Sequence, residues 1–267
     1  MIYVNAIILA VVEGLTEFLP ISSTGHLILV ENYLPLGPSG DSSFSDAFIV
    51  MIQLPAIASV AVYFWRRLWP FSQGVEHRTR TLGLWFNIGA AVVPAVVMAL
   101  LFDDIIEEYL FAPIPVAIAL VVGGLILIYL ERRKHTTRFE TVHEVPLRTS
   151  IAIGFFQCLA LFPGTSRSAA TIIGAMILGT SRAAAAEFSF FLAIPTMCGA
   201  CTYTIVKNGL GFTGEQWRLI LLGSVVSFIT AYLSVAFLMR YIQKHDFTAF
   251  GIYRIVLGVI VLLAFLG

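Results

Sequence analysis

Charged side chains are scarce in this chain of 267 residues. Asp, Glu, Lys and Arg make up 12 % of it, whereas soluble domains usually carry about 25 %. Hydrophobic residues make up 58 %, and the mean hydropathy is +0.90. Sixteen basic residues balance sixteen acidic ones, which removes any electrostatic case for a nucleic-acid partner. The composition therefore predicts a protein that is solvated largely by membrane lipids.

Cysteine and targeting signals are also scarce. Cys198 and Cys201 form a C-x-x-C, but this lies in an apolar segment with no other metal-type ligand beside it. We therefore interpret these thiols, and Cys158, as packing residues. The N-terminus has no basic segment, and Glu13 interrupts its first apolar stretch, so it does not resemble a cleaved signal peptide.

Long apolar segments predict an all-α, polytopic integral membrane protein. A membrane-spanning helix needs about 20 apolar residues. Six segments meet this requirement: approximately 47–66, 84–102, 113–131, 187–206, 218–240 and 250–267.

Two further apolar regions, about 2–30 and 149–180, are broken in the middle by Pro20 and by Pro163. Proline removes a backbone donor, so each region is expected to form two short helices around a turn. Such a turn is tolerated at membrane depth only when it is buried in protein or lines a wet cavity. We therefore predict two re-entrant hairpins.

The order of these elements repeats. Each broken region is followed by a span that contains a second proline, and then by two more spans. Pro55 comes 35 residues after Pro20, and Pro195 comes 32 residues after Pro163. The chain is thus predicted to form a single transmembrane domain over 1–267, with internal repeats at about 1–135 and 147–267. Because each repeat contributes three full spans, the second repeat should enter the membrane from the opposite side, as in many transporters.

The distribution of Lys and Arg gives an independent orientation. Loops 66–80, 131–148 and 240–247 are rich in these residues, whereas segments 31–46 and 102–112 hold none. The positive-inside rule makes the first group cytoplasmic and the second external. The first hairpin should then open outward and the second inward, with their tips meeting near the midplane.

Glu13 and Glu17 are the first candidate functional pair. They lie four residues apart, on one face of a helix, where two carboxylates repel each other. A shared proton, a partner cation or a metal has to compensate, and Mg²⁺ or Ca²⁺ suits carboxylate oxygens. Alternatively, the two residues lie at the membrane interface, or one of the carboxyls is simply protonated, and neither has a functional role. Ionisable residues inside membranes are usually functional, which favours the site.

Ser22, Ser23, Thr24 and His26 follow the break at Pro20. A hydroxyl beside an imidazole is the minimum for an activated nucleophile. Helix capping can account for one or two of the hydroxyls, but not for the histidine.

The second motif, Pro163-Gly-Thr-Ser-Arg-Ser-Ala-Ala-Thr171, opens a helix with small hydroxyl residues. A helix N-terminus offers unpaired N–H groups to phosphate, and Arg167 adds a bidentate fork. Alternatively, Arg167 pairs with Glu17 and ties the hairpins together, and both can hold in the resting state. Arg182 and Glu187 are also expected to pair with each other.

Together these motifs resemble those of the undecaprenyl-diphosphate phosphatases of the bacitracin-resistance type, over essentially the whole chain. The resemblance implies removal of the terminal phosphate from a C55 isoprenoid diphosphate, which regenerates the carrier lipid for cell-wall polymer synthesis. It implies Glu13 and Glu17 as metal or acid/base residues. Ala169 departs from the glycine expected there, and the second repeat has Gln157 and Leu161 in place of the carboxylate pair.

The expected site combines a Mg²⁺ or Ca²⁺ ion on Glu13 and Glu17, catalytic roles for Glu17, Ser23, His26 and Arg167, and Ser23 as nucleophile with His26 as base. A phosphohistidine at His26, or a water activated by Glu17 or His26, stays open. The candidate substrate-binding residues are Ser22, Thr24, Thr165, Ser166, Ser168 and Thr171.

The expected partners are a polyprenyl diphosphate, membrane lipids and, as an open option, a second copy of the chain. The expected location is the bacterial plasma (inner) membrane, with the site open to the external or periplasmic side. The alternative function is a transporter or flippase for a lipid phosphate or an anion, built on the same inverted repeat.

Overall fold

The computed structural model describes residues 1–31, 33–36, 43–72, 74–110, 112–133, 136–209 and 211–266. This part of the chain is helical and holds no β-strand, only one isolated bridge between Phe139 and Thr180. The elements, in chain order, are α1 (Ile2–Thr16), α2 (Ser23–Glu31), α3 (Ser43–Tyr63), α4 (Trp65–Leu68), α5 (Gly74–Leu110), α6 (Pro113–Arg132), η1 (Val142–Glu144), α7 (Leu147–Gln157), η2 (Cys158–Leu161), α8 (Arg167–Ile177), α9 (Arg182–Asn208), α10 (Gly214–Tyr241) and α11 (Thr248–Leu266).

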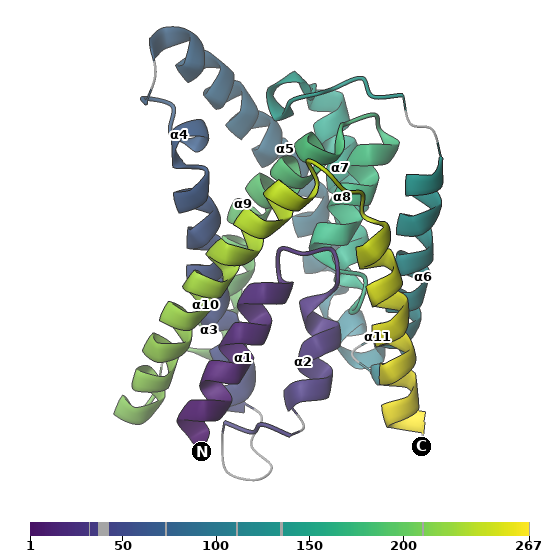
Figure 1. Cartoon of the computed structure of the whole chain (residues 1–267). Coiled ribbons are helices and arrows are strands. Elements are labelled where there is room, and N and C mark those ends of the chain that lie inside the picture. The colour runs from purple at the N-terminus through teal and green to yellow at the C-terminus, as the bar shows by residue number, and fades with distance from the viewer. Residues whose placement is uncertain are drawn as a thin grey trace.

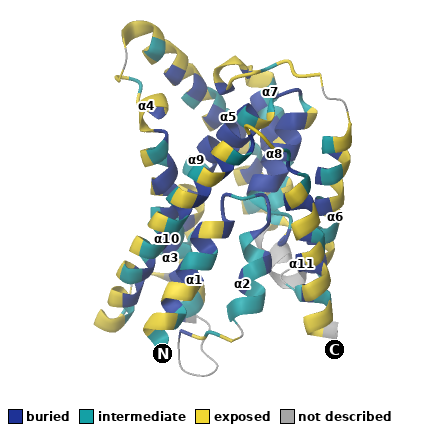
Figure 2. Ribbon diagram, viewed as in Figure 1, coloured by how far each residue is buried: buried dark blue, intermediate teal, exposed yellow. Residues whose placement is uncertain are grey.

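Six of these helices are long and apolar enough to cross a membrane: α3, α5, α6, α9, α10 and α11. Each coincides with a span predicted from the sequence, so that prediction of an all-α membrane protein is confirmed. The helices run roughly along the height of the molecule (Figure 1). Outward-facing exposed residues alternate with buried ones along them, as expected for helices that meet lipid on one side (Figure 2).

The two broken regions form short helices on either side of a turn, as the prolines predict. α1 rises from the end of the molecule that carries the N-terminus to a turn at mid-height, and α2 runs back (Figure 1). α7 and α8 lie mainly in the other half, and α8 is buried along most of its length.

Both turns end on a serine with positive φ. Ser22 and Ser166 each have φ 71°, a conformation that costs free energy for a residue with a Cβ. The Ser22 hydroxyl accepts a hydrogen bond from the amide of Gly25 at 3.3 Å, and the Ser166 hydroxyl accepts one from the amide of Ala169 at 3.2 Å. Each serine therefore caps the helix that follows it, and these bonds offset part of the strain.

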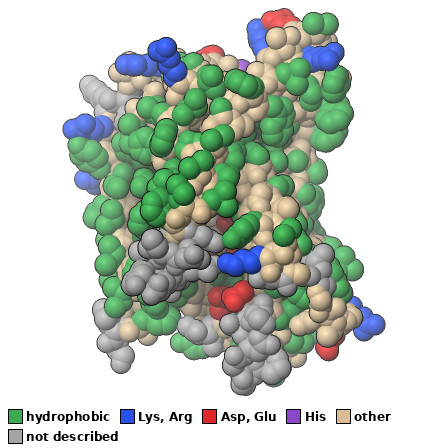
Figure 3. All heavy atoms as spheres, turned by 180° about the vertical axis from the view of Figure 1, so that it is seen from behind, with side chains coloured by type: hydrophobic (Ala, Val, Ile, Leu, Met, Phe, Trp, Pro, Cys, Tyr) green, Lys and Arg blue, Asp and Glu red, His purple; other side chains and the backbone are tan. Residues whose placement is uncertain are grey.

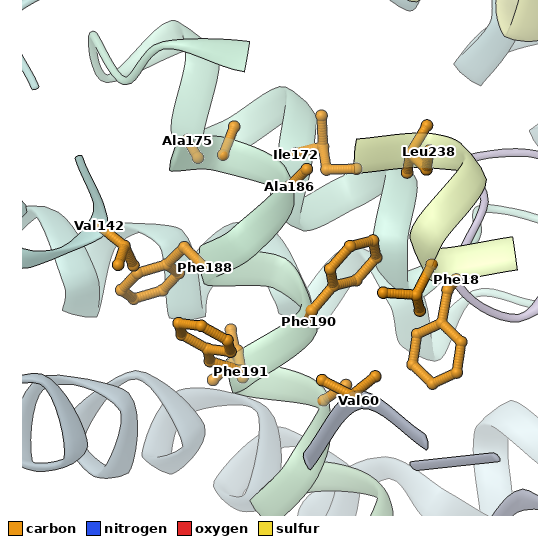
Figure 4. Close-up of a cluster of buried hydrophobic side chains, with 14 of the residues drawn as sticks. Phe18, Val60, Val142, Ile172, Ala175, Ala186, Phe188, Phe190, Phe191 and Leu238 are labelled. Carbon is orange, nitrogen blue, oxygen red and sulfur yellow. The ribbon is translucent and has the colours of Figure 1, made fainter. Parts of the chain in front are cut away.

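The largest apolar cluster is built around α9. Phe188, Phe190 and Phe191 are fully buried and project from one turn of this helix toward α3, α10 and the η1 segment (Figure 4). The ring of Phe190 meets that of Phe18 edge to face, with centroids 5.7 Å apart. This contact fixes the first turn against α9, whose residues Ser189 and Met197 contribute to the site below.

Charged residues gather at the ends of the helices. One face of the molecule is hydrophobic over most of its height, with Lys and Arg mainly at its upper end (Figure 3). Here the expected pairing of Arg182 with Glu187 is wrong. Arg182 instead bonds Glu131 of α6, at 2.6 Å for its closest contact, and Glu187 pairs with Arg67. Both pairs join different helices, which sequence proximity does not reveal.

Candidate active site

The carboxylate of Glu17 joins the two turns. Glu17 follows the last residue of α1, and one of its oxygens accepts a hydrogen bond from the Ser23 hydroxyl at 2.6 Å. Its other oxygen accepts one from Nη2 of Arg167 at 3.1 Å. Both side chains of the ion pair are about nine-tenths buried, at 11 % and 9 % exposure. The structure thus brings together a hydroxyl, a carboxylate and a guanidinium from three helix ends.

Arg167 is the first residue of α8 and is held from several sides. Nη1 donates to the carbonyl of Ser189 at 3.0 Å, and Nη2 also lies 3.4 Å from the sulfur of Met197. Its Nε, although buried, has no hydrogen-bond partner within the described part of the chain. A buried, charged N–H donor without an acceptor costs free energy, so this group is well suited to an anionic ligand.

Glu13 lies one helical turn before Glu17 and is fully buried. Among the described residues neither of its carboxylate oxygens has a hydrogen-bond partner, although the side chain of Gln53 lies close by. A carboxylate so placed requires either a proton or a cation. Its oxygens and those of Glu17 are the hard donors that Mg²⁺ and Ca²⁺ prefer, so these two residues fit such an ion, whereas the Gln53 amide oxygen lies toward the thiol of Cys201.

His26 has partners other than Ser23. One ring nitrogen, Nδ1, lies 2.7 Å from the carbonyl oxygen of Ser22, and Nε2 lies 2.7 Å from the phenol oxygen of Tyr253. Because a carbonyl only accepts, Nδ1 carries the proton, and in the neutral ring Nε2 accepts from the phenol. The Ser23 hydroxyl donates to Glu17 instead, so the neighbour able to take its proton is Glu17.

The remaining hydroxyls line the two turns. Ser168 donates to the carbonyl of Leu19 at 2.8 Å and so ties the second turn to the first, and its Oγ lies 3.0 Å from that of Ser166. The Thr171 hydroxyl lies 2.7 Å from that of Ser189 and is fully buried.

In this structure the hydroxyls of Ser168 and Thr171 therefore bond other protein groups and help to hold the turns in place. Thr24 and Thr165 are half-buried; Thr24 lies in α2, and Thr165 comes just before the residue that caps α8.

An apolar groove leads to this region from the surface. It has a volume of about 730 Å³, runs between α1, α10 and α11, and reaches His26 and Tyr253. Its wall includes Val12, Leu19, Leu233 and Phe237. A polar site at the end of an apolar groove suits an amphiphile with a long hydrocarbon chain.

Comparison with known proteins agrees with this geometry. The family model described as "Bacitracin resistance protein BacA" matches residues 6–260. The chain belongs to this family.

It is 48 % identical over 263 residues to a protein of Clostridioides difficile named "Undecaprenyl-diphosphatase 1", covering 98 % of this chain and 95 % of that one. It is 46 % identical to "Undecaprenyl-diphosphatase" of Enterococcus faecalis, covering 97 % and 95 %. A protein of the same name from Fusobacterium nucleatum is 48 % identical, covering 96 % and 98 %.

In this member of the BacA family, residues that the motifs did not indicate also lie beside the candidate site. Tyr253 of α11 contacts His26 in α2, the carbonyl of Ser189 in α9 accepts from Arg167, and Arg254 of α11 donates to the carbonyl of Pro20 in the first turn. Ser189 and Tyr253 look like ordinary residues of apolar helices, and only folding brings them to the site. Arg254 could have been singled out from the sequence, because it is a charged residue inside a predicted span.

We expect Tyr253→Phe to change the environment of His26 without unfolding the protein. The substitution removes the phenol that donates to Nε2 and keeps the ring. Nitrogen NMR of histidine-labelled protein should show His26 protonated at Nδ1 and a shift of its Nε2 resonance in the variant. Tyr129→Phe, on the exposed side of α6, is the matched control. An unchanged His26 spectrum in Tyr253→Phe would contradict the assigned contact.

Proposed function

We propose that this chain is a membrane phosphatase that hydrolyses undecaprenyl diphosphate to undecaprenyl phosphate and inorganic phosphate. The relatives bearing this enzyme name are 46–48 % identical to it over nearly its whole length. The reaction recycles the lipid carrier for cell-wall polymers. Bridging of Ser23 and Arg167 by Glu17 is the observation that supports the chemistry most directly.

The mechanism follows from that bridge. Ser23 attacks the terminal phosphorus while its proton passes to Glu17, which lies within the range required of a general base. A bond forms between Ser23 Oγ and phosphorus, and the bond to the bridging oxygen breaks, so undecaprenyl phosphate leaves. Water then attacks the phosphoserine, and the proton on Glu17 returns to the serine oxygen as phosphate departs.

Arg167 stabilises the charge that develops on the transferred phosphoryl group. Its unpaired Nε can donate to a phosphate oxygen, and Arg167 stands at the N-terminus of α8, where the helix favours negative charge. A nucleophilic His26, or a water molecule activated by Glu17, is the alternative. Ser23 is favoured because its hydroxyl already meets a carboxylate, whereas both nitrogens of His26 are engaged.

A phosphate-release assay on purified protein in detergent tests this function. Hydrolysis needs no sealed compartment, whereas transport does, so release in micelles separates the phosphatase from a transporter. Ser23→Ala and Glu17→Gln should abolish nearly all release, and Arg167→Lys should lower it about 10²–10³-fold, because an ammonium loses the bidentate geometry.

Ser59→Ala is the control, since the Ser59 hydroxyl is buried and, within the described part of the chain, bonds the carbonyl of Ala56 in its own helix and nothing else. No release by the unsubstituted protein, with substrate present as mixed micelles, would refute the proposal. Robust release by Ser23→Ala would refute the serine nucleophile alone.

We expect a divalent cation, Mg²⁺ or Ca²⁺, to be held by Glu13 and Glu17. The orphaned oxygens of Glu13 support this expectation. When bound, such an ion would neutralise charge on the diphosphate. Chelation should silence the protein, and readded Mg²⁺ or Ca²⁺ should restore it.

Elemental analysis should find metal in the unsubstituted protein and less in Glu13→Gln. Full activity in excess chelator, with no metal detected, would make the two carboxylates acid/base groups instead.

The inverted repeat and the re-entrant hairpins belong to the same proposal. Helix pairings support them: α1 packs on α10 as α7 packs on α5, and α2 meets α11 as α8 meets α6. α6 and α11 pack on each other, as corresponding elements beside a two-fold axis should. This pairing supports the proposal of a single domain over 1–267 with repeats at about 1–135 and 147–267.

We further infer that the site faces the outside of the plasma membrane. The loops before α5, before α7 and before α11 lie at one end of the molecule, opposite both termini (Figure 1). Together with the helix ends beside them, in segments 66–80, 131–148 and 240–247, they hold 11 of the 16 Lys and Arg residues. Parts of the external segments 31–46 and 102–112 lie outside the described residues.

In oriented vesicles an impermeant thiol reagent should label Thr24→Cys only from the external side, and diphosphate substrate should protect it. The three native cysteines are replaced by alanine for this experiment. Ser72→Cys, in an exposed loop at the opposite end, should be labelled only from inside. The reverse pattern in active protein would overturn the orientation. A homodimer stays a hypothesis, which light scattering in detergent tests.

A further inference from the structure

Arg254 is a fully buried arginine in the first half of α11. Among the described side chains no carboxylate forms an ion pair with it. Its guanidinium instead donates to backbone carbonyls. These are the carbonyls of Leu120 (3.4 Å), Pro20 (3.3 Å), Ala119 (3.2 Å), Gly164 (3.1 Å) and Thr165 (2.9 Å).

Two of these carbonyls occupy the same place in the two turns. Pro20 stands two residues before Ser22, and Gly164 stands two residues before Ser166, the serines with positive φ. Nη1 bonds the first carbonyl and Nη2 the second. One guanidinium therefore holds corresponding points of both turns, while Nε and Nη2 anchor it to α6.

The crossing of α6 and α11 leaves room for this group. A Cβ at Gly123 would lie 2.9 Å from Cζ of Arg254, closer than real contacts allow. A Cβ at Gly124 would lie 2.6 Å from the carbonyl of Gly251. Glycines at these positions let the helices approach closely, and they leave the space that the guanidinium fills.

The chemistry of arginine suits this task. Its planar fork carries five donors in fixed directions and keeps its charge in an apolar site. Lysine would offer one point charge, which cannot reach carbonyls on two turns and on α6 at once. Without these donors, carbonyls at the two turns would lose partners in a region where water is scarce.

We propose that Arg254 is a positioning residue that fixes the two turns at one separation. Glu17 and Ser23 belong to the first turn and Arg167 to the second, so their meeting depends on that separation. Arg254 acts through the backbone and does not contact the reacting atoms. The expected effect of Arg254 on turnover rests on the proposed phosphatase function. Its expected effect on the separation of the two turns does not.

The main test compares Arg254→Lys with Gly123→Ala. The lysine keeps the charge but lacks the fork, and the alanine keeps Arg254 but displaces its guanidinium. Both should lower kcat at least about 30-fold and change KM less than about threefold, because the misplaced groups act mainly on the transition state. Gly89→Ala, where a Cβ meets open space, is the matched control and should keep normal kcat.

A double-mutant cycle separates positioning from general loss of stability. In the Arg167→Lys background, Arg254→Lys should lower kcat less than about threefold further, because the contact that it positions is already lost. The proposal would be overturned if the double variant lost kcat by the full product of the two single losses. Normal kcat in Arg254→Lys alone would overturn it as well.

Hydrogen exchange measured by mass spectrometry gives a readout that needs no activity. Arg254→Lys and Gly123→Ala should both speed exchange at 18–26 and 162–170 and leave α5 and α10 unchanged. Unchanged exchange at the turns, or faster exchange throughout, would refute the positioning role. Failure of the unsubstituted protein to release phosphate would refute the proposed function and leave this exchange pattern to decide the inference.

Discussion

The ion pair between Glu17 and Arg167 is the interaction on which the site depends. Both side chains lie about nine-tenths buried in a protein whose outer surface meets lipid. Each charge alone would be costly there, at about 2.5–3.5 kcal/mol for a charged residue at a helix centre on insertion scales. Pairing lowers that cost only if the two turns that carry the residues meet, so the architecture has to hold them together.

Several features of the fold serve that meeting. The breaks at Pro20 and Pro163 bring helix ends, with their free amides, into the interior, and Ser22 and Ser166 cap the helices that begin there. Ser168 ties the turns directly, by donating to the carbonyl of Leu19. The phenylalanines of α9 fill the space beside them, so that the carbonyl of Ser189 faces Arg167.

The two turns are alike in backbone but different in chemistry. The first carries Glu13 and Glu17, and the second has Gln157 at the place that corresponds to Glu13 by its distance from the capping serine. Gln157 is buried and lies 3.3 Å from the Thr196 hydroxyl, whereas Glu13 has no such partner among the described residues. The same scaffold therefore holds a neutral, satisfied amide in one half and an unsatisfied carboxylate in the other. This difference supports the proposal that the first turn is the reactive one.

The sequence by itself determined the six spans, the two breaks and the residue types of the site. Apolar length, proline and helix-capping chemistry act over neighbouring residues, so Glu17, Ser23 and Arg167 could be chosen from their local context. Pairing of Glu17 with Arg167 was already among the alternatives that the sequence left open. Tertiary structure alone decided that Ser23 faces Glu17 while His26 faces Tyr253, that Arg182 bonds Glu131, and that Arg254 reaches both turns. These contacts join residues on different helices or on two sides of a sharp turn, and their partners depend on how the helices pack, which local sequence preferences do not specify.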